Sequence, residues 1–179
     1  MKLILTLLMI FVCSITNAQV ENEEIELSKK ANYYFHFYFG FDKNLLSDED
    51  RDFFEKSEKI DTKYWASKAI NLFSELIKRY PNSTNQAEYL YKNGILNMDI
   101  FDYEVSKNCF IKGVELSDSE YKKLDLLNLA KIACLEKNYY ETARYIKLMK
   151  NVKANIEEST EDFINRNLER MKNSGCFDK

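Results

Sequence analysis

Residues 94–113 read GILNMDIFDYEVSKNCFIKG, and they are the most informative stretch of the chain because their landmarks recur at a fixed interval. Ser106 lies within this stretch, 37 residues after Ala69 and 37 residues before Ala143. A constant interval of this size indicates stacked copies of one small unit, each too small to bury its own apolar side. The sequence therefore predicts a helical-repeat architecture.

The neighbours of these three positions repeat in step with them. Three residues before each position lie, in order, Ala66, Tyr103 and Tyr140. Phe73 and Phe110 lie four residues after Ala69 and Ser106. Leu76 and Gly113 lie seven residues after the same two positions. Small and aromatic positions matched at helical spacing predict paired helices that pack closely.

The composition agrees with an all-α fold, since only one proline and four glycines occur in 179 residues. Sheet proteins draw on these residue types for their frequent turns, so their scarcity favours long helices and short polar loops. The aromatic run at 33–41 predicts a helix that packs along the first repeat and ends at Gly40. Apolar spacing and helix-boundary residues predict further helices over 47–59, 64–80, 85–98, 103–116, 121–136, 139–152 and 158–173.

The first eighteen residues have the pattern of a secretory signal peptide. Lys2 is followed by a mostly aliphatic run over 3–12, and the small residues before position 19 suit cleavage after Ala18. The run is too short to span a membrane, and no second apolar stretch of spanning length follows. We therefore expect an exported protein, periplasmic or extracellular, without an integral membrane segment in the mature chain. The expected organisation is a signal peptide at 1–18, an acidic and aromatic segment at 19–46, helical repeats at 47–155, and a capping helix with a tail at 156–179.

Over residues 48–151 the units resemble tetratricopeptide repeats (TPRs). That family has a small residue in the first helix, an aromatic residue at the start of the second, then a small, an aromatic and another small residue, and a closing proline. The middle unit matches this pattern at Gly94, Tyr103, Ser106, Phe110 and Gly113. The first unit matches it at Ser57, Ala69, Phe73 and Pro81.

The third unit fits the same pattern less well. Tyr140 and Ala143 agree with it, whereas Lys147 and Lys150 stand where an aromatic and a small residue are expected. Its first helix registers only if Ala130, one residue out of step, is the small position. The resemblance, to a secreted bacterial member of the family, implies a right-handed, TPR-like solenoid of about three antiparallel helix pairs. The N-terminal aromatic helix precedes this stack and a C-terminal capping helix closes it, and a generic helical bundle is the alternative.

By the same resemblance, the first helices of the pairs line a hollow face, where residues one turn from each small position face a ligand. Exposed aromatic residues beside charges suit a peptide groove, since they offer contact area at low entropy cost. Two alternatives stay open: the hollow face is free to bind, or the N-terminal segment or the last helix fills it. The candidate residues are Arg51, Phe54, Glu58, Glu88, Tyr91, Ile95, Leu127 and Lys131.

Several functional classes lack support in the sequence. The formal net charge is −3 and no basic block stands out, which argues against nucleic acid as a partner. The single histidine, His36, lies in the aromatic run, where a buried structural role is the simpler interpretation. No catalytic, phosphate-binding or metal-binding motif occurs, so we expect no enzyme activity, metal or cofactor.

Removal of the signal peptide leaves Cys109, Cys134 and Cys176, and an odd number leaves at least one thiol unpaired. The repeat pattern makes the helices of Cys109 and Cys134 neighbours, so a bridge between these two is one alternative. A role as small buried hydrophobic residues is the simpler one. Residues 174–176 are expected to form a frayed end.

The expected partner is therefore another protein or a peptide. The leading hypothesis is an exported, non-catalytic TPR-like interaction module or scaffold of the cell envelope. The alternative is an immunity or inhibitor protein that occupies the active site of a secreted toxin, because such proteins are small, exported, acidic and often helical. An enzyme has no positive support, and a lipid or small-molecule carrier rests only on the aromatic run at 33–41.

Overall fold

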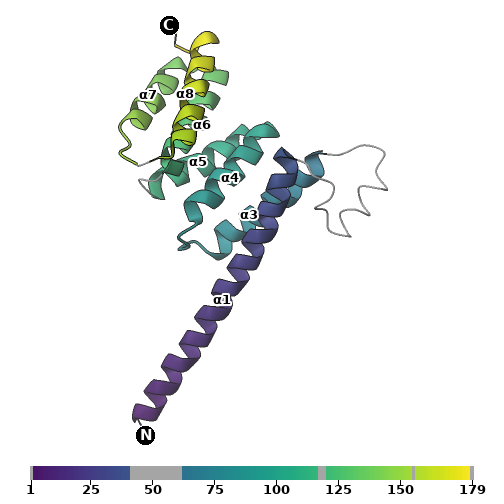
Figure 1. The fold of residues 1–179 in the computed structure, drawn as a ribbon, viewed down its shortest axis with the longest axis vertical. Helices are drawn as coiled ribbons and strands as arrows, with labels where there is room; N and C mark the ends of the chain where they lie inside the picture. The colour runs from purple at the N-terminus through teal and green to yellow at the C-terminus, as the bar shows by residue number, and fades with distance from the viewer. Residues whose placement is uncertain (1, 41–61, 117–119, 155, 178–179) are drawn as a thin grey trace, which may run out of the picture. The chain divides into compact units, whose positions relative to one another are not determined.

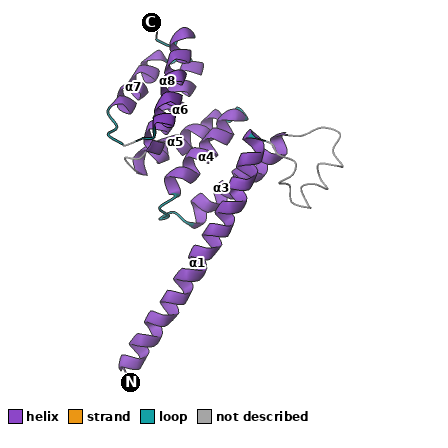
Figure 2. Ribbon diagram, viewed as in Figure 1, coloured by secondary structure: helices purple, strands orange, loops and turns teal. Residues whose placement is uncertain are grey.

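The computed structural model describes residues 2–40, 62–116, 120–154 and 156–177. These residues form seven α-helices and no strand, which confirms the all-α prediction (Figure 1, Figure 2). The chain divides into two compact units, Met1–Tyr80 and Pro81–Lys179. The helix predicted over 47–59 lies outside the described residues.

The first unit contains helices α1 (Lys2–Phe39) and α3 (Thr62–Arg79), which pack against each other through aromatic side chains. The buried Trp65 ring of α3 lies 6.0 Å from the Tyr34 ring and 5.7 Å from the Phe37 ring, between centroids. Helix α1 ends where the sequence predicts, and the Gly40 N–H donates to the His36 carbonyl oxygen at 2.7 Å. Because α1 begins at Lys2, it runs through the predicted signal peptide, whose cleavage stays a prediction.

His36 is exposed on α1, so the expectation of a buried histidine is wrong. The reason is helical periodicity. Ala31, Tyr34 and Phe37 recur at three-residue spacing and are buried, whereas a residue one position before Phe37 projects about 100° away around the axis.

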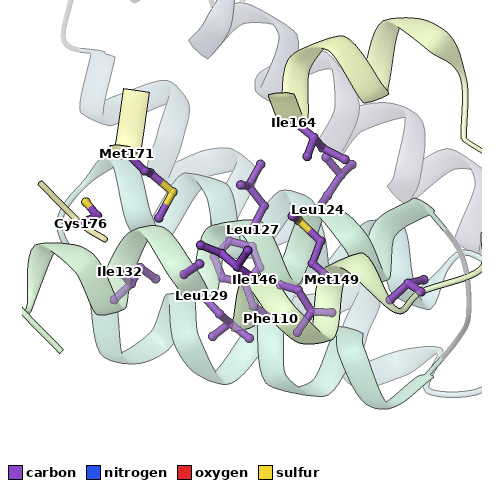
Figure 3. Packing of buried hydrophobic residues seen from close by; sticks show 13 residues of the cluster. Phe110, Leu124, Leu127, Leu129, Ile132, Ile146, Met149, Ile164, Met171 and Cys176 are labelled. Atoms are coloured by element: carbon purple, nitrogen blue, oxygen red, sulfur yellow. The ribbon is translucent and has the colours of Figure 1, made fainter. Parts of the chain in front are cut away.

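The second unit contains five helices whose bounds fall within two residues of the predicted ones. They are α4 (Gln86–Asp99), α5 (Tyr103–Leu116), α6 (Glu120–Leu135), α7 (Tyr139–Lys150) and α8 (Glu158–Asn173). Helix α4 packs against α5, α5 against α6, and α6 against α7; α4 also packs against α6, and α8 packs against α6. In the shared core, Leu124 and Leu127 of α6 lie in one cluster with Ile164 and Met171 of α8 (Figure 3).

Gly94 allows α4 and α5 to approach closely, as the sequence predicts. A Cβ atom built on Gly94 would lie 2.5 Å from the fully buried ring of Phe110, closer than real contacts allow. The buried Ser106 hydroxyl donates to the Gly94 carbonyl oxygen at 2.8 Å, which ties the two helices together at this point. Gly113, one turn after Phe110 on α5, is also buried and lies against the Asp125 side chain of α6.

The turns that follow α4 and α6 have the same geometry. Phe101 and Lys137 adopt positive φ values of 68° and 59°. The next residues, Asp102 and Asn138, each donate a backbone N–H to the carbonyl oxygen five residues earlier at 2.8 Å, the bond typical of a Schellman motif. Their side chains then cap α5 and α7 by accepting from the N–H three residues later, at 3.2 Å in both cases. These matched turns are 36 residues apart, not 37.

The 36-residue interval corrects the predicted alignment of the third unit. Ala143 is exposed, whereas Thr142, 36 residues after Ser106, is fully buried. At the same interval from Phe110 and Gly113 lie the buried Ile146 and Met149. The aromatic and small positions that the 37-residue interval assigned to Lys147 and Lys150 are therefore core positions filled by Ile146 and Met149. Ala130 lies 36 residues after Gly94 and so fits the same interval. The third unit therefore follows the repeat pattern when the interval from the second unit is 36 residues, one fewer than predicted.

A disulfide joins Cys134, at the end of α6, to Cys176, which follows α8, with their Cα atoms 5.5 Å apart. Cys109 is buried and free. The alternative of a Cys109–Cys134 bridge is therefore wrong, and of the three cysteines only Cys109 is a simple buried residue. Residues 174–176 are not frayed, because Cys176 is buried and its N–H donates to the Met171 carbonyl oxygen at 3.0 Å.

Candidate functional site

The candidate site lies where α4 and α6 pack together. The 36-residue interval pairs Glu88, Tyr91 and Ile95 of α4 with Leu124, Leu127 and Lys131 of α6, and we call these six residues the α4–α6 face. Sequence analysis placed five of them on the hollow face. Leu124 was not among them, although it lies 36 residues after Glu88.

Two tyrosines form the centre of this site. The rings of Tyr91 on α4 and Tyr121 on α6 lie 5.6 Å apart between centroids, and both side chains are half-buried. A pocket of about 540 Å³ lies beside Tyr121, and its lining includes Glu88 and the connection over 81–85. A smaller pocket of about 230 Å³ is lined by Tyr91, Leu124 and the first turns of α8. The tyrosine pair thus separates two hollows of mixed polar and apolar lining.

Both phenols are protonated at neutral pH, and burial extends that form to more alkaline pH. Desolvation is the largest cause that raises the pKa of Tyr91 to about 12, and the nearby Asp125 carboxyl adds to the effect. The pKa of Tyr121 is also raised to about 12, again mainly by burial and further by Glu88. Glu88 itself accepts from the Lys92 ammonium at 2.5 Å. The site therefore offers two phenolic donors and a paired carboxylate.

Helix α8 covers the far end of the face, as one of the two alternatives anticipated. The Lys131 ammonium lies 3.3 Å from the Asn128 side-chain oxygen and 5.3 Å from the centre of the Phe163 ring of α8. Burial, and then the positive charge of Arg170, lower the pKa of Lys131 to about 8. Leu127 has 0% exposure, so its side chain is a core residue and has no surface to offer a ligand.

The remaining candidates differ in their surroundings. Ile95 is half-buried and packs against the core of the second unit. Arg51, Phe54 and Glu58 lie outside the described residues. Of the predicted residues that the structure describes, Glu88 and Tyr91 line pockets, whereas Ile95 packs in the core and Lys131 lies against Phe163 of α8.

Asp125 is a buried acid directly behind the tyrosine pair. It has 0% exposure, and neither carboxylate oxygen has a hydrogen-bond partner among the described residues. A Cβ atom on Gly113 would lie 3.0 Å from the Asp125 Cγ atom, so the missing side chain of Gly113 provides the space for the carboxyl group. Desolvation raises the pKa of Asp125 to about 9, so this carboxyl is neutral at pH 7.

Sequence reasoning missed Tyr121, Asp125 and the α8 residues that line the smaller pocket, Ser159, Thr160 and Phe163. Leu124 was findable from the 36-residue interval. Tyr121 lies in the first turn of α6, and the residue 36 positions earlier is Asn85, so the repeat pattern does not single it out. Asp125 gave no signal, because an aspartate inside a helix is ordinarily exposed. The α8 residues depend on how the last helix lies over α6, which spacing alone does not reveal.

The described residues contain no cluster of histidine, cysteine or acidic side chains suited to a metal ion. Among those same residues, no helix has both the length and the apolar character needed to cross a bilayer. Comparison of the chain with protein-family models, with curated proteins and with solved structures found no match.

Proposed function

We propose that this chain is an exported, non-catalytic protein-interaction module with a TPR-like arrangement, which binds an extended segment of another envelope protein along the α4–α6 face. The observation that carries the proposal is the Tyr91–Tyr121 pair between two open pockets. Tyrosine suits such a role, because a rigid ring supplies apolar area while its hydroxyl bonds to a peptide group.

The packing of the second unit supports the TPR-like part of the proposal. Consecutive helices pack pairwise, and the two first helices, α4 and α6, also contact each other. The close-packing positions Gly94, Ser106 and Phe110 meet at one point, as the family pattern implies. A stack of this kind presents its first helices together on one face, which is where the pockets lie.

The disulfide supports the export part of the proposal. Bridges between cysteines form and persist in oxidising compartments and are rare in reducing ones. The Cys134–Cys176 bridge joins buried or half-buried positions of two packed helices, so it suits a stable structural bond. Together with the signal-peptide pattern, it favours a protein that matures outside the cytoplasm.

Photo-crosslinking in the native host tests the partner. A benzoylphenylalanine at position 121 of the full chain is expected to capture one protein reproducibly, whereas the same residue at Ile111, an exposed position of α5 outside both pockets, is not. Capture of the same proteins from both positions, or of none from position 121, would contradict the proposal. If the captured protein is a secreted toxin, the inhibitor alternative replaces the scaffold hypothesis.

Thiol counting tests export independently. The protein recovered from the native host is expected to begin at Gln19 and, once denatured without reductant, to expose one free thiol, that of Cys109. A chain retained in the cytoplasm would keep Cys13 and release the other cysteines as free thiols. Edman sequencing and mass spectrometry of alkylated peptides distinguish these results.

A further inference from the structure

A second surface of the same unit lies between α7 and α8, away from the residues of the α4–α6 face. Both helices pack in the core with α6, and a groove of about 650 Å³ runs between them. Its apolar lining includes Ile146 of α7, Leu168 of α8 and Phe177 beyond the end of α8. We call this hollow the α7–α8 groove.

The accessible part of the apolar lining is formed by Leu168 and Phe177, because Ile146 is buried. Phe177 keeps 38% of its surface exposed, and Leu168 is half-buried. Phe177 directly follows Cys176, which the disulfide attaches to the end of α6. The bridge therefore holds an exposed aromatic ring at one boundary of the groove.

The polar part of the groove is strongly basic. Lys147 and Lys150 on α7 and Lys172 on α8 all line it and are exposed, whereas Glu169 is the one carboxylate among the lining residues. None of these three lysines forms a salt bridge to a described residue. The chain as a whole is acidic, with a formal charge of −3, so this local excess of positive charge contrasts with the rest of the molecule.

We propose that the α7–α8 groove binds an acidic amphipathic helix of a partner protein. The apolar side of such a helix would pack on Leu168 and Phe177, and its flanking carboxylates would pair with Lys147, Lys150 and Lys172. Helix-in-groove recognition uses apolar residues at i, i+3, i+4 and i+7 in this way, and charge complementarity selects the partner. The proposal does not depend on the function assigned to the α4–α6 face.

Designed peptides test the groove with the full, oxidised chain. Three probes of equal length are used: an amphipathic helix with leucine on one side and glutamate on the other, the same peptide with lysine for glutamate, and a scrambled acidic peptide. Fluorescence anisotropy is expected to show at least tenfold tighter binding of the acidic amphipathic helix than of either other probe. Its affinity is expected to fall as salt is raised, since exposed charges are screened.

Matched variants locate the binding. The double variant Lys147→Glu, Lys150→Glu and the single variant Phe177→Ala are each expected to weaken binding at least tenfold. The control pair Lys112→Glu, Lys137→Glu makes the same charge change at exposed positions outside the groove and is expected to preserve it. Tyr121→Ala should also leave it unchanged, which separates this proposal from the function of the α4–α6 face. Circular dichroism checks that every variant is folded.

The proposal would be overturned by no binding of the acidic amphipathic probe, by equal binding of the lysine probe, or by full binding by the Lys147→Glu, Lys150→Glu variant. Equal binding of the scrambled acidic probe would also overturn it, because it would assign the groove to an extended acidic chain rather than to a helix.

Discussion

At the scale of single residues, the most unusual feature is a carboxylic acid sealed inside a helical core. Asp125 occupies space that Gly113 leaves open, with no described hydrogen-bond partner. Burying a charge without a partner is very costly, so the group stays protonated instead. The tyrosines next to it, with pKa values raised to about 12, remain neutral over the same range. Asp125, with a pKa of about 9, thus titrates before either tyrosine as pH rises.

The stability of the fold should therefore fall as pH rises from 5 to 7. The folded state keeps the Asp125 proton up to a pKa of about 9, whereas the unfolded chain releases it near 3.8, so the folded state binds more protons between these values. The free energy of unfolding then decreases by at most about 1.4 kcal/mol per pH unit from this group. The prediction covers pH 5 to 7 only, because Lys131, with a pKa of about 8, begins to lose its proton above pH 7.

Urea unfolding of Asp125→Asn measures this contribution. The variant keeps the shape of the protonated acid and cannot ionise, so its stability should change less between pH 5 and 7 than that of the parent chain. Asp162→Asn, which removes an exposed carboxyl on α8, is the matched control and should follow the parent. Equal pH slopes for the parent and Asp125→Asn would contradict the burial of a neutral acid.

Gly94 gives a second residue-scale prediction. Alanine is favoured over glycine inside a helix by about 1 kcal/mol, yet here its Cβ would overlap the buried Phe110 ring. Overpacking a core costs about 1–3 kcal/mol, so we expect Gly94→Ala to lower the free energy of unfolding by up to about 2 kcal/mol. A second variant, Gly94→Ala with Phe110→Leu, should recover part of the loss. Chemical denaturation of both variants checks this, and a stabilised Gly94→Ala would refute the close contact.

At the scale of elements, the third unit shows how far a sequence pattern can place a helix. The helix bounds were predicted within two residues, because Schellman turns at Phe101 and Lys137 and caps at Asp102 and Asn138 act locally. The register of α7 within its repeat was wrong by one residue. The exposed Ala143 directly follows the buried Thr142, and its small size made it the apparent counterpart of Ser106.

Lysine substitution at the two adjacent positions tests that register. Thr142→Lys places a charge in the core and should lower the free energy of unfolding by more than about 3 kcal/mol, since buried unpaired charges give the largest effects. Ala143→Lys lies on the surface and should change it by less than about 0.5 kcal/mol. Thermal denaturation compares the two. Similar losses for both variants, or a larger loss for Ala143→Lys, would restore the 37-residue interval.

The candidate site was predictable in part. Glu88 and Tyr91 are positions that the resemblance to TPRs implies, and both line pockets in the structure. The burial of Asp125 was not predictable, and cover by the last helix was only one of two open alternatives, because each depends on contacts between separate helices. The disulfide partner of Cys134 was missed for this reason too: Cys176 lies 42 residues further along the chain.

At the scale of the whole molecule, the two compact units hold themselves together differently. Aromatic packing between α1 and α3 stabilises the first unit, with Trp65 against Tyr34 and Phe37. The second unit adds a covalent link, which attaches the end of the last helix to α6. Since α8 supplies Ile164 and Met171 to the core and also covers part of the α4–α6 face, its attachment affects both stability and binding.

Removal of the disulfide should therefore loosen α8 before the rest of the second unit. A bridge that closes a loop of this length contributes about 4 kcal/mol in the chain-entropy description, and native bridges typically contribute about 2–4 kcal/mol. We expect the double variant Cys134→Ser, Cys176→Ser to lower the free energy of unfolding by about 2–4 kcal/mol. Hydrogen exchange should show the largest loss of protection in α8 and near Phe177, with α4 and α5 changed least. Cys109→Ser, which removes the free buried thiol, is the control and should leave α8 protected. Uniform loss across all five helices would mean that the bridge stabilises the unit as a whole and that α8 is held mainly by its apolar contacts.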